Sequence, residues 1–195
     1  MTVPIARILP LDSENRWSDL LAVLIEADPG CVAALLGLEG NRTSLRVRRE
    51  VSTEGKDRID LVLELESLPR SVIEVKVLSG LGRQQLSRYR TALPEAEHYL
   101  LVFPERLQID IAAQEGWRAI TWERLLTAFS RSSDAWVAET AQAWAQHLAS
   151  SLPRVGADTR WNDLHVGEDF VLAMRARMSW VFGQLAPRNR YSTTW

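Results

Sequence analysis

The spacing of apolar residues predicts an amphipathic helix near the start of the chain, over residues 12–28. Apolar side chains recur there every three or four positions, as they do on the buried face of a helix. They are Trp17, Leu20, Leu21 and Leu24. Asp12 or Ser13 would cap this helix, and Pro29-Gly30 would end it. The apolar stretch 31–38 predicts a further short helix or a continuation of the first.

Alternation of apolar and polar side chains then predicts three consecutive strands, at residues 43–51, 58–66 and 71–78. The second strand would carry Ile59, Leu61, Leu63 and Leu65 on one face and Asp60, Val62, Glu64 and Glu66 on the other. The sequence "SLPR", residues 67–70, is typical of a hairpin connection. Further along, the pattern predicts a helix at 80–93, strands at 98–104 and 117–122, and a helix at 122–130.

The chain after residue 132 has a helical pattern, with a long helix at 134–150 and another at 167–185. The first of these would place Trp136, Thr140, Trp144 and Leu148 on one stripe. Three meandering strands, a crossover helix and a later strand indicate an α/β fold with a mixed sheet flanked by helices. We therefore expect a core at 1–130 and a C-terminal helical extension at 131–195 that packs on the core or on a partner.

Composition narrows the class of protein. The chain has 195 residues, 46% hydrophobic and 25% charged, as in an ordinary globular domain. It contains no apolar run long enough for a transmembrane helix and no signal-peptide pattern at its start, so a cytoplasmic location is expected. Cys31 is the only cysteine, which excludes a disulfide within the chain and a zinc-ribbon site.

The net charge of −2 gives no overall attraction to nucleic acid, but the charge is unevenly distributed. Residues 42–90 carry eleven Lys and Arg against seven Asp and Glu. A polyanion could be bound locally by this segment. A solvated basic edge of the sheet explains the same excess equally well.

The third predicted strand, "SVIEVKVL", carries a glutamate and a lysine on one face. Because strand side chains alternate, Ile73, Val75 and Val77 lie on one face, and Glu74 and Lys76 on the other. A second Glu-x-Lys triplet, at residues 54–56, falls in a turn with no flanking motif. For Glu74 and Lys76, by contrast, a hairpin brings in Asp60 from the polar face of the preceding strand.

These residue types suit metal-assisted hydrolysis of a phosphodiester. Mg²⁺ prefers oxygen ligands and is commonly held by one or two carboxylates together with water. Asp60, Glu74 and the backbone carbonyl of Val75 could supply three such ligands. Lys76 could hold the attacking water or stabilise charge on the phosphate. Burial among strands would tend to lower the pKa of Lys76.

The motifs "RIDLVLEL", "VIEVKV" and "RQQLSRY", in the predicted order of elements, resemble the PD-(D/E)XK nuclease superfamily over about residues 12–125. The resemblance implies a restriction-endonuclease-like fold. It assigns the family's catalytic and metal-binding positions to Asp60, Glu74, Lys76, Gln85 and Glu14. More narrowly, the pattern Asp…Glu-x-Lys…Gln-Leu-x-x-Tyr is similar to that of a subgroup of bacterial members. In this chain "EVK" stands where relatives of the subgroup often have "ENK". The roles are unaffected, because the middle residue would act through its carbonyl.

The resemblance also implies cofactor and partners. Such enzymes are typically Mg²⁺-dependent DNA nucleases of restriction, repair or phage defence, with Mn²⁺ as a substitute. Many of them pair, so a homodimer through the Trp-rich tail is expected by analogy, and a further protein partner such as a motor or sensor stays open. No membrane partner is expected.

Each candidate residue also has an alternative explanation. Asp60, Glu74 and Lys76 could form an ordinary cross-strand ion pair, which contributes little to stability. Gln85 could be an unremarkable polar residue at a helix start, and Glu14 could simply favour the helix dipole. The same fold could also serve as a non-catalytic nucleic-acid-binding or scaffold module.

Overall fold

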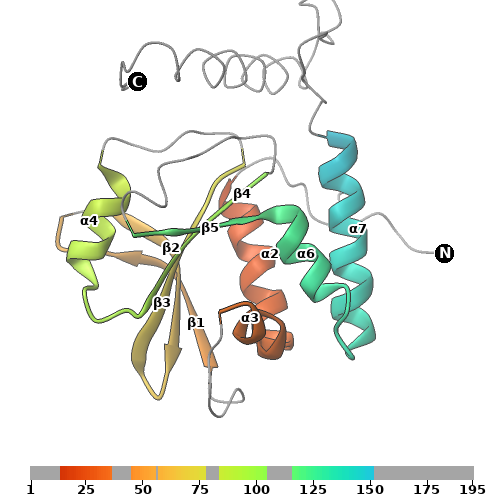
Figure 1. The fold of residues 1–195 in the computed structure, drawn as a ribbon, viewed down its shortest axis with the longest axis horizontal. Helices are drawn as coiled ribbons and strands as arrows, with labels where there is room; N and C mark the ends of the chain where they lie inside the picture. Colours follow the sequence, from red (N-terminus) through yellow and green to blue (C-terminus); the bar gives the residue numbers. More distant parts are fainter. Residues whose placement is uncertain (1–13, 37–44, 56, 78–83, 105–115, 152–195) are drawn as a thin grey trace, which may run out of the picture.

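The computed structural model describes residues 14–36, 45–55, 57–77, 84–104 and 116–151 (Figure 1). Five strands form one sheet in the order in which they follow along the chain. They are β1 (Leu45–Ser52), β2 (Arg58–Leu65), β3 (Leu68–Val75), β4 (His98–Phe103) and β5 (Arg118–Thr121). The first three pair antiparallel, and β3, β4 and β5 pair parallel. The predicted α/β class with a mixed sheet is confirmed.

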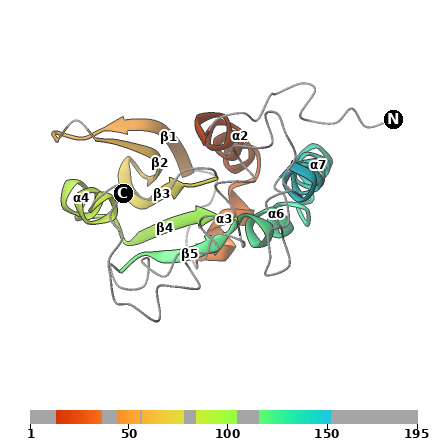
Figure 2. The ribbon, with the colours of Figure 1, turned by 90° about the horizontal axis from the view of Figure 1, so that it is seen from above.

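Within the described ranges, five helices accompany the sheet. They are α2 (Glu14–Ala27), α3 (Pro29–Leu36), α4 (Gln85–Ala92), α6 (Trp122–Phe129) and α7 (Ala135–Ser151). Helix α4 lies on one side of the sheet, and α2, α6 and α7 lie on the other (Figure 2). The sheet is therefore covered by helices on both faces, as is usual where parallel strands are present.

Each face of the sheet has its own hydrophobic core. The first core packs side chains of α2, α3, α6 and α7 against Leu61, Leu63, Ile73, Val75 and Val77. The second packs Leu86 and Tyr89 of α4 against Ile59, Val62 and Val72. Together they leave the end of β3 between two packed layers.

The predicted helices near the N-terminus are confirmed. All four residues of the expected stripe of α2, Trp17, Leu20, Leu21 and Leu24, are buried. Helix α2 ends at Ala27, and the stretch after it forms the separate helix α3, which begins at Pro29, a position that suits a helix start.

The stripe expected on α7 is partly wrong. Trp136 is 52% exposed, whereas Trp144 and Leu148 are buried as expected. The buried stripe also includes Val137 and Ala141 in place of Trp136 and Thr140. One position along a helix is a rotation of about 100°. The buried positions 137, 141, 144 and 148 follow the helical period, whereas a constant spacing of four residues from Trp136 drifts around the helix.

Two details of the β2–β3 hairpin also differ from expectation. Strand β3 begins at Leu68, so the connection is only Glu66-Ser67, and Pro69 and Arg70 belong to the strand. Ile59 does not share a face with Leu61 and Leu63, because it packs in the second core. At Ile59, β2 is paired with β1 alone, because its ladder with β3 begins only at Leu61.

Some predictions lie outside the described residues, among them the caps Asp12 and Ser13 and the helix at 167–185. Helix α7 packs on α6, and its buried residues belong to the first core. The division into 1–130 and 131–195 stays a prediction. Within the described ranges, no helix has the length and apolar character needed to cross a membrane.

Candidate active site

The candidate site lies where β2 and β3 separate. The two strands are paired as far as Leu61 and Ile73. Beyond this point the backbone N–H of Val75 donates instead to Oδ2 of Asp60, at 2.8 Å. The Asp60 carboxylate therefore takes the place of a strand partner. The N–H and C=O of one strand residue point to the same side, so the carbonyl of Val75 also faces this gap.

Glu74 lies beside this gap and is almost completely buried, with 1% of its surface exposed. Its Oε1 accepts from Nζ of Lys76 at 2.7 Å and from Nε2 of Gln85 at 2.7 Å. Its Oε2 is buried and has no hydrogen-bond partner among the described residues. A buried carboxylate oxygen without a donor is costly, and it marks a place where a cation or a proton would be stabilised.

Glu14, in the first turn of α2, reaches the end of β3 from the other side. Its Oε1 accepts from the backbone N–H of Val77 at 2.9 Å. Its Oε2 lies 3.6 Å from Nζ of Lys76. The lysine ammonium is therefore placed between Glu14 and Glu74, and Lys76 is only 6% exposed.

Gln85 comes from the first turn of α4, on the opposite side of the sheet from α2. Besides Glu74, its Nε2 donates to the hydroxyl of Tyr89 at 2.8 Å. The Tyr89 hydroxyl in turn donates to the carbonyl of Arg58 at 2.7 Å. This chain of bonds turns the amide nitrogen of Gln85 toward Glu74.

The structure thus brings together all five side chains that the sequence singled out: Glu14, Asp60, Glu74, Lys76 and Gln85. Their proximity is observed, while their catalytic roles stay predictions. The ordinary exposed cross-strand pair that we weighed as an alternative does not describe Glu74 and Lys76, because both are buried.

Burial and mutual repulsion dominate the electrostatics. Burial, together with repulsion from Asp60, raises the pKa of Glu74 to about 8 against the attraction of Lys76. Burial also raises the pKa of Asp60, although the Val75 N–H and Lys76 oppose the increase. Three carboxyl groups face one ammonium group, so the site holds more negative charge than it can balance.

The expected fall in the pKa of Lys76 is wrong. Burial alone would lower this pKa, but the surrounding carboxylates reverse the direction. Attraction to Glu74 and then to Glu14 outweighs the effect of burial, and the pKa is raised. Lys76 is accordingly a stable ammonium group rather than a proton acceptor.

Two further residues, Tyr89 and Trp122, belong to the site but were not among the predicted site residues. Tyr89 ends the motif "RQQLSRY" but was given no role in the site, yet its hydroxyl accepts from the amide of Gln85 and orients it. Trp122 was expected to begin a helix, yet its indole N–H donates to the carbonyl of Lys76 at 3.1 Å. The spacing of Gln85 and Tyr89, four residues apart in a predicted helix, is the one signal that could have indicated the first of them.

The donor set suits a small divalent cation. Asp60 and Glu74 offer carboxylate oxygens, one of them unpartnered, and Val75 offers a carbonyl toward the same gap. Two carboxylates and a carbonyl match what Mg²⁺ accepts in proteins. Larger clusters are not found: the described part of the chain has no group of three or more His, Cys, Asp and Glu arranged to hold a metal ion.

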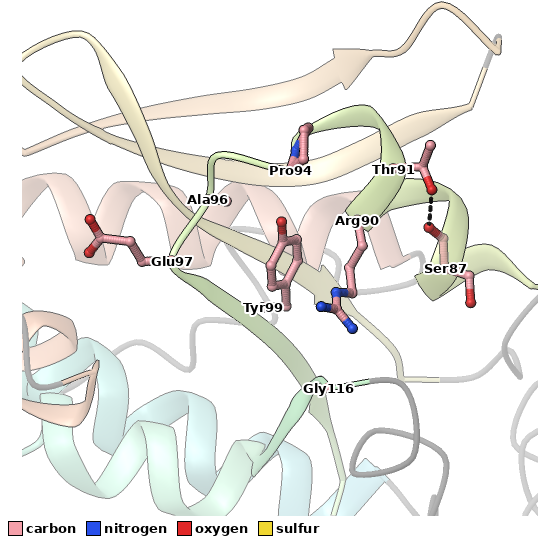
Figure 3. A pocket seen from close by; sticks show the side chains of 8 residues that line it. All are labelled: Ser87, Arg90, Thr91, Pro94, Ala96, Glu97, Tyr99 and Gly116. Atoms are coloured by element: carbon pink, nitrogen blue, oxygen red, sulfur yellow. Dashed lines mark hydrogen bonds between the residues drawn. The ribbon is translucent and has the colours of Figure 1, made fainter.

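A pocket of about 640 Å³ lies away from this site, beside the C-terminal half of α4 (Figure 3). The guanidinium of Arg90 lies over the ring of Tyr99, 5.3 Å from its centroid. A Cβ at Gly116, whose φ is +74°, would come within 2.6 Å of Arg90 Nη1. The Arg90 guanidinium therefore lies between an aromatic ring and a backbone turn at the edge of this pocket.

Comparisons with known proteins identify no relative from which a function of the site could be inferred. The chain matches no protein-family model, no curated protein and no solved structure. Function is therefore inferred from the residues that meet at the end of β3.

Proposed function

We propose that the chain is a metal-dependent nuclease of the PD-(D/E)XK type, a hydrolase that cleaves phosphodiester bonds in DNA with Mg²⁺, or with Mn²⁺ as a substitute. One observation carries the proposal. A buried site between two separating strands gathers three carboxyl groups around a single lysine, and one oxygen of Glu74 has no donor among the described residues. Such an excess of negative charge favours a bound cation.

Asp60, Glu74 and the carbonyl of Val75 would hold the ion. When bound, a divalent cation lowers the pKa of a coordinated water and offsets charge on the phosphate. The raised pKa of Glu74, about 8, is consistent with this role, because the proton that Glu74 retains near neutral pH occupies a place where a cation can substitute for it.

Lys76 would act on the substrate through its ammonium group. Its pKa is raised, so it carries a full charge near neutral pH. That charge can orient a water for in-line attack or stabilise the oxygens of the phosphate as negative charge builds on them. Gln85 would keep Glu74 oriented through the 2.7 Å bond between its amide and Oε1. Glu14 would limit the positions open to Lys76.

A second candidate is a non-catalytic nucleic-acid-binding module on the same fold. Asp60 and Glu14 each accept a backbone N–H, from Val75 and Val77. Each acid therefore supports the end of β3 whether or not the chain is an enzyme, and its presence is explained without catalysis.

The deciding experiment is cleavage of plasmid and single-stranded DNA with Mg²⁺ or Mn²⁺. We expect activity that is abolished by EDTA and falls by about a hundredfold or more in Lys76→Ala and Asp60→Asn, since each removes charge from the reacting centre. Asparagine can still accept the Val75 N–H, so the fold is kept. Glu54→Ala, in the Glu-x-Lys triplet of the β1–β2 turn, is the matched control and should cleave like wild type.

The outcomes separate the two candidates. DNA that is bound but not cleaved by the folded wild type would favour the binding module. Cleavage that survives both EDTA and Lys76→Ala would contradict the proposed mechanism.

A further inference from the structure

The peptide unit that joins Lys76 to Val77 is held from both sides by side chains. Its carbonyl accepts from the indole N–H of Trp122 at 3.1 Å. Its N–H donates to Oε1 of Glu14 at 2.9 Å. No strand supplies either partner: α6 supplies the first and α2 the second.

The sequence explains why a strand does not supply the donor for this carbonyl. In the parallel β3–β4 register, the N–H of Lys76 donates to the carbonyl of Val102 at 2.8 Å. The next bond of such a ladder would run from the N–H of residue 104 to the carbonyl of Lys76. Residue 104 is a proline, which has no N–H. Pro104 thus withholds the donor of the ladder, and Trp122 replaces it.

Trp122 is well suited to fix an atom in place. Its side chain is completely buried, with 0% exposed. Its ring packs on Trp17 of α2, at 5.2 Å between centroids, and on Trp144 of α7, at 4.8 Å. Trp17 lies one helical turn after Glu14, so α2 contacts both the indole and the peptide unit that the indole holds. A side chain confined on several sides has little freedom to follow a shift of its partner.

We propose that Trp122 is a positioning residue for Lys76. Its indole N–H sets the orientation of the Lys76–Val77 peptide unit, and that orientation sets the direction in which the lysine side chain leaves the strand. This inference rests on the proposed function, because it assigns Trp122 an effect on the step in which Lys76 acts. Removal of the N–H lets the peptide unit rotate and lowers the fraction of molecules in which the ammonium group faces the reacting phosphate.

The test is Trp122→Phe, compared with Trp144→Phe as a matched control. Both variants remove the same atoms from the same aromatic cluster. The indole N–H of Trp144, however, is buried without a hydrogen-bond partner among the described residues. We expect Trp122→Phe to lower kcat for DNA cleavage about tenfold, the effect of leaving one buried carbonyl unpaired, with KM unchanged. Trp144→Phe should keep the wild-type kcat.

A rescue variant tests the ladder directly. Pro104→Ala restores an N–H opposite the carbonyl of Lys76, so the double variant Trp122→Phe/Pro104→Ala should regain most of the lost kcat. If Trp122→Phe alone does not fold, the double variant decides: folded protein with near wild-type kcat supports the proposal. Unfolded protein, or a persistent tenfold loss, overturns it. Equal losses in Trp122→Phe and Trp144→Phe also overturn it.

Amide hydrogen exchange separates this proposal from the proposed function. The N–H of Val77 belongs to the held peptide unit, and its exchange should become about tenfold faster in Trp122→Phe and stay unchanged in Trp144→Phe. If the wild-type protein cleaves no DNA, the proposed function is contradicted, but the positioning role of Trp122 is not. Exchange at Val77 that Trp122→Phe leaves unchanged removes the positioning role, whatever the activity.

Discussion

At the scale of single residues, Glu74 combines burial with a surplus of nearby negative charge. One of its oxygens receives two donors and the other receives none among the described residues. Asp60 adds repulsion, and the result is a carboxyl group whose pKa rises to about 8. A residue that carried only a structural role would be more stable as an amide, since an amide has no charge to bury.

The metal-free protein should therefore lose stability as the pH rises. The pKa of a glutamate is ordinarily 4.5, the value expected in the unfolded chain, whereas the pKa of Glu74 is about 8 in the folded protein. Between these values the folded state retains a proton that the unfolded state has released, so the free energy of unfolding falls through this window and the loss is complete above about pH 8. In EDTA, the free energy of unfolding of Glu74→Gln should match that of wild type near pH 4 and exceed it by roughly 4 kcal/mol at pH 8.

Urea denaturation at several pH values measures this difference. Glu54→Gln, at an exposed carboxyl group, is the control and should parallel wild type at every pH. A constant difference between Glu74→Gln and wild type across the window would contradict the expected titration.

At the scale of elements, the turn between β2 and β3 shows a backbone under strain. Glu66 and Ser67 have φ values of 53° and 66°. Positive φ at both central residues is what a two-residue type I′ turn requires, and Asn-Gly is the preferred sequence there. Neither glutamate nor serine favours this conformation, and each costs about 1 kcal/mol relative to glycine.

Ser67→Gly should accordingly raise the free energy of unfolding by about 0.5 to 1 kcal/mol, because glycine adopts positive φ without a steric cost. Chemical denaturation would measure the change. Ser87→Gly, the same substitution within helix α4, is the control and should have the opposite sign, about 0.5 kcal/mol of destabilisation. A loss of stability in both variants would show that the turn is not strained.

The same turn shows where prediction from sequence fails. The two-residue connection carries no Asn-Gly signal, so the pattern placed the hairpin at "SLPR", where proline and serine give the usual indication of a turn. Elements with a clear period were found correctly, α2 and β4 among them. The error on α7 has a different origin, because the predicted positions 136, 140, 144 and 148 keep a constant spacing of four, which drifts around a helix of 3.6 residues per turn.

For the candidate site, too, the features set by local rules could be predicted from the sequence, and those set by tertiary packing could not. Asp60, Glu74 and Lys76 could be paired from strand alternation and a hairpin, which are local rules. The strands β2 and β3 separate beyond Leu61 and Ile73, and this places the Asp60 carboxylate against the N–H of Val75. Where they separate depends on the pairing of β2 with both β1 and β3. The contact of Trp122 with Lys76 joins residues 46 positions apart. Neither the strand separation nor this hydrogen bond can be read from the spacing of apolar residues in the sequence.

At the scale of the whole molecule, α7 is part of the first hydrophobic core. Val137, Ala141, Trp144 and Leu148 are buried, and Trp144 packs on Trp17 and Trp122. A chain cut at residue 130 would expose this surface of α2 and α6.

We therefore expect the fragment 1–130 to lack a cooperative unfolding transition, and Trp144→Ala in the full chain to cost about 3 to 5 kcal/mol, as for a large buried aromatic residue. Circular dichroism with urea would measure both. Trp136→Ala, which changes an exposed tryptophan of the same helix, is the matched control and should cost less than about 0.5 kcal/mol. If the fragment 1–130 unfolds cooperatively with wild-type stability, α7 is not needed for the stability of the rest of the fold.

The proline at the end of β4 has a consequence for how this sequence can change over time. As long as position 104 is a proline, position 122 must supply a side-chain N–H, and most replacements of Trp122 leave the carbonyl of Lys76 bare. Once position 104 acquires an ordinary amide, position 122 is released to become any large apolar residue. Substitutions at the two positions are therefore coupled, although the positions lie on different elements. The carbonyl keeps a donor throughout only if the proline is replaced before the tryptophan.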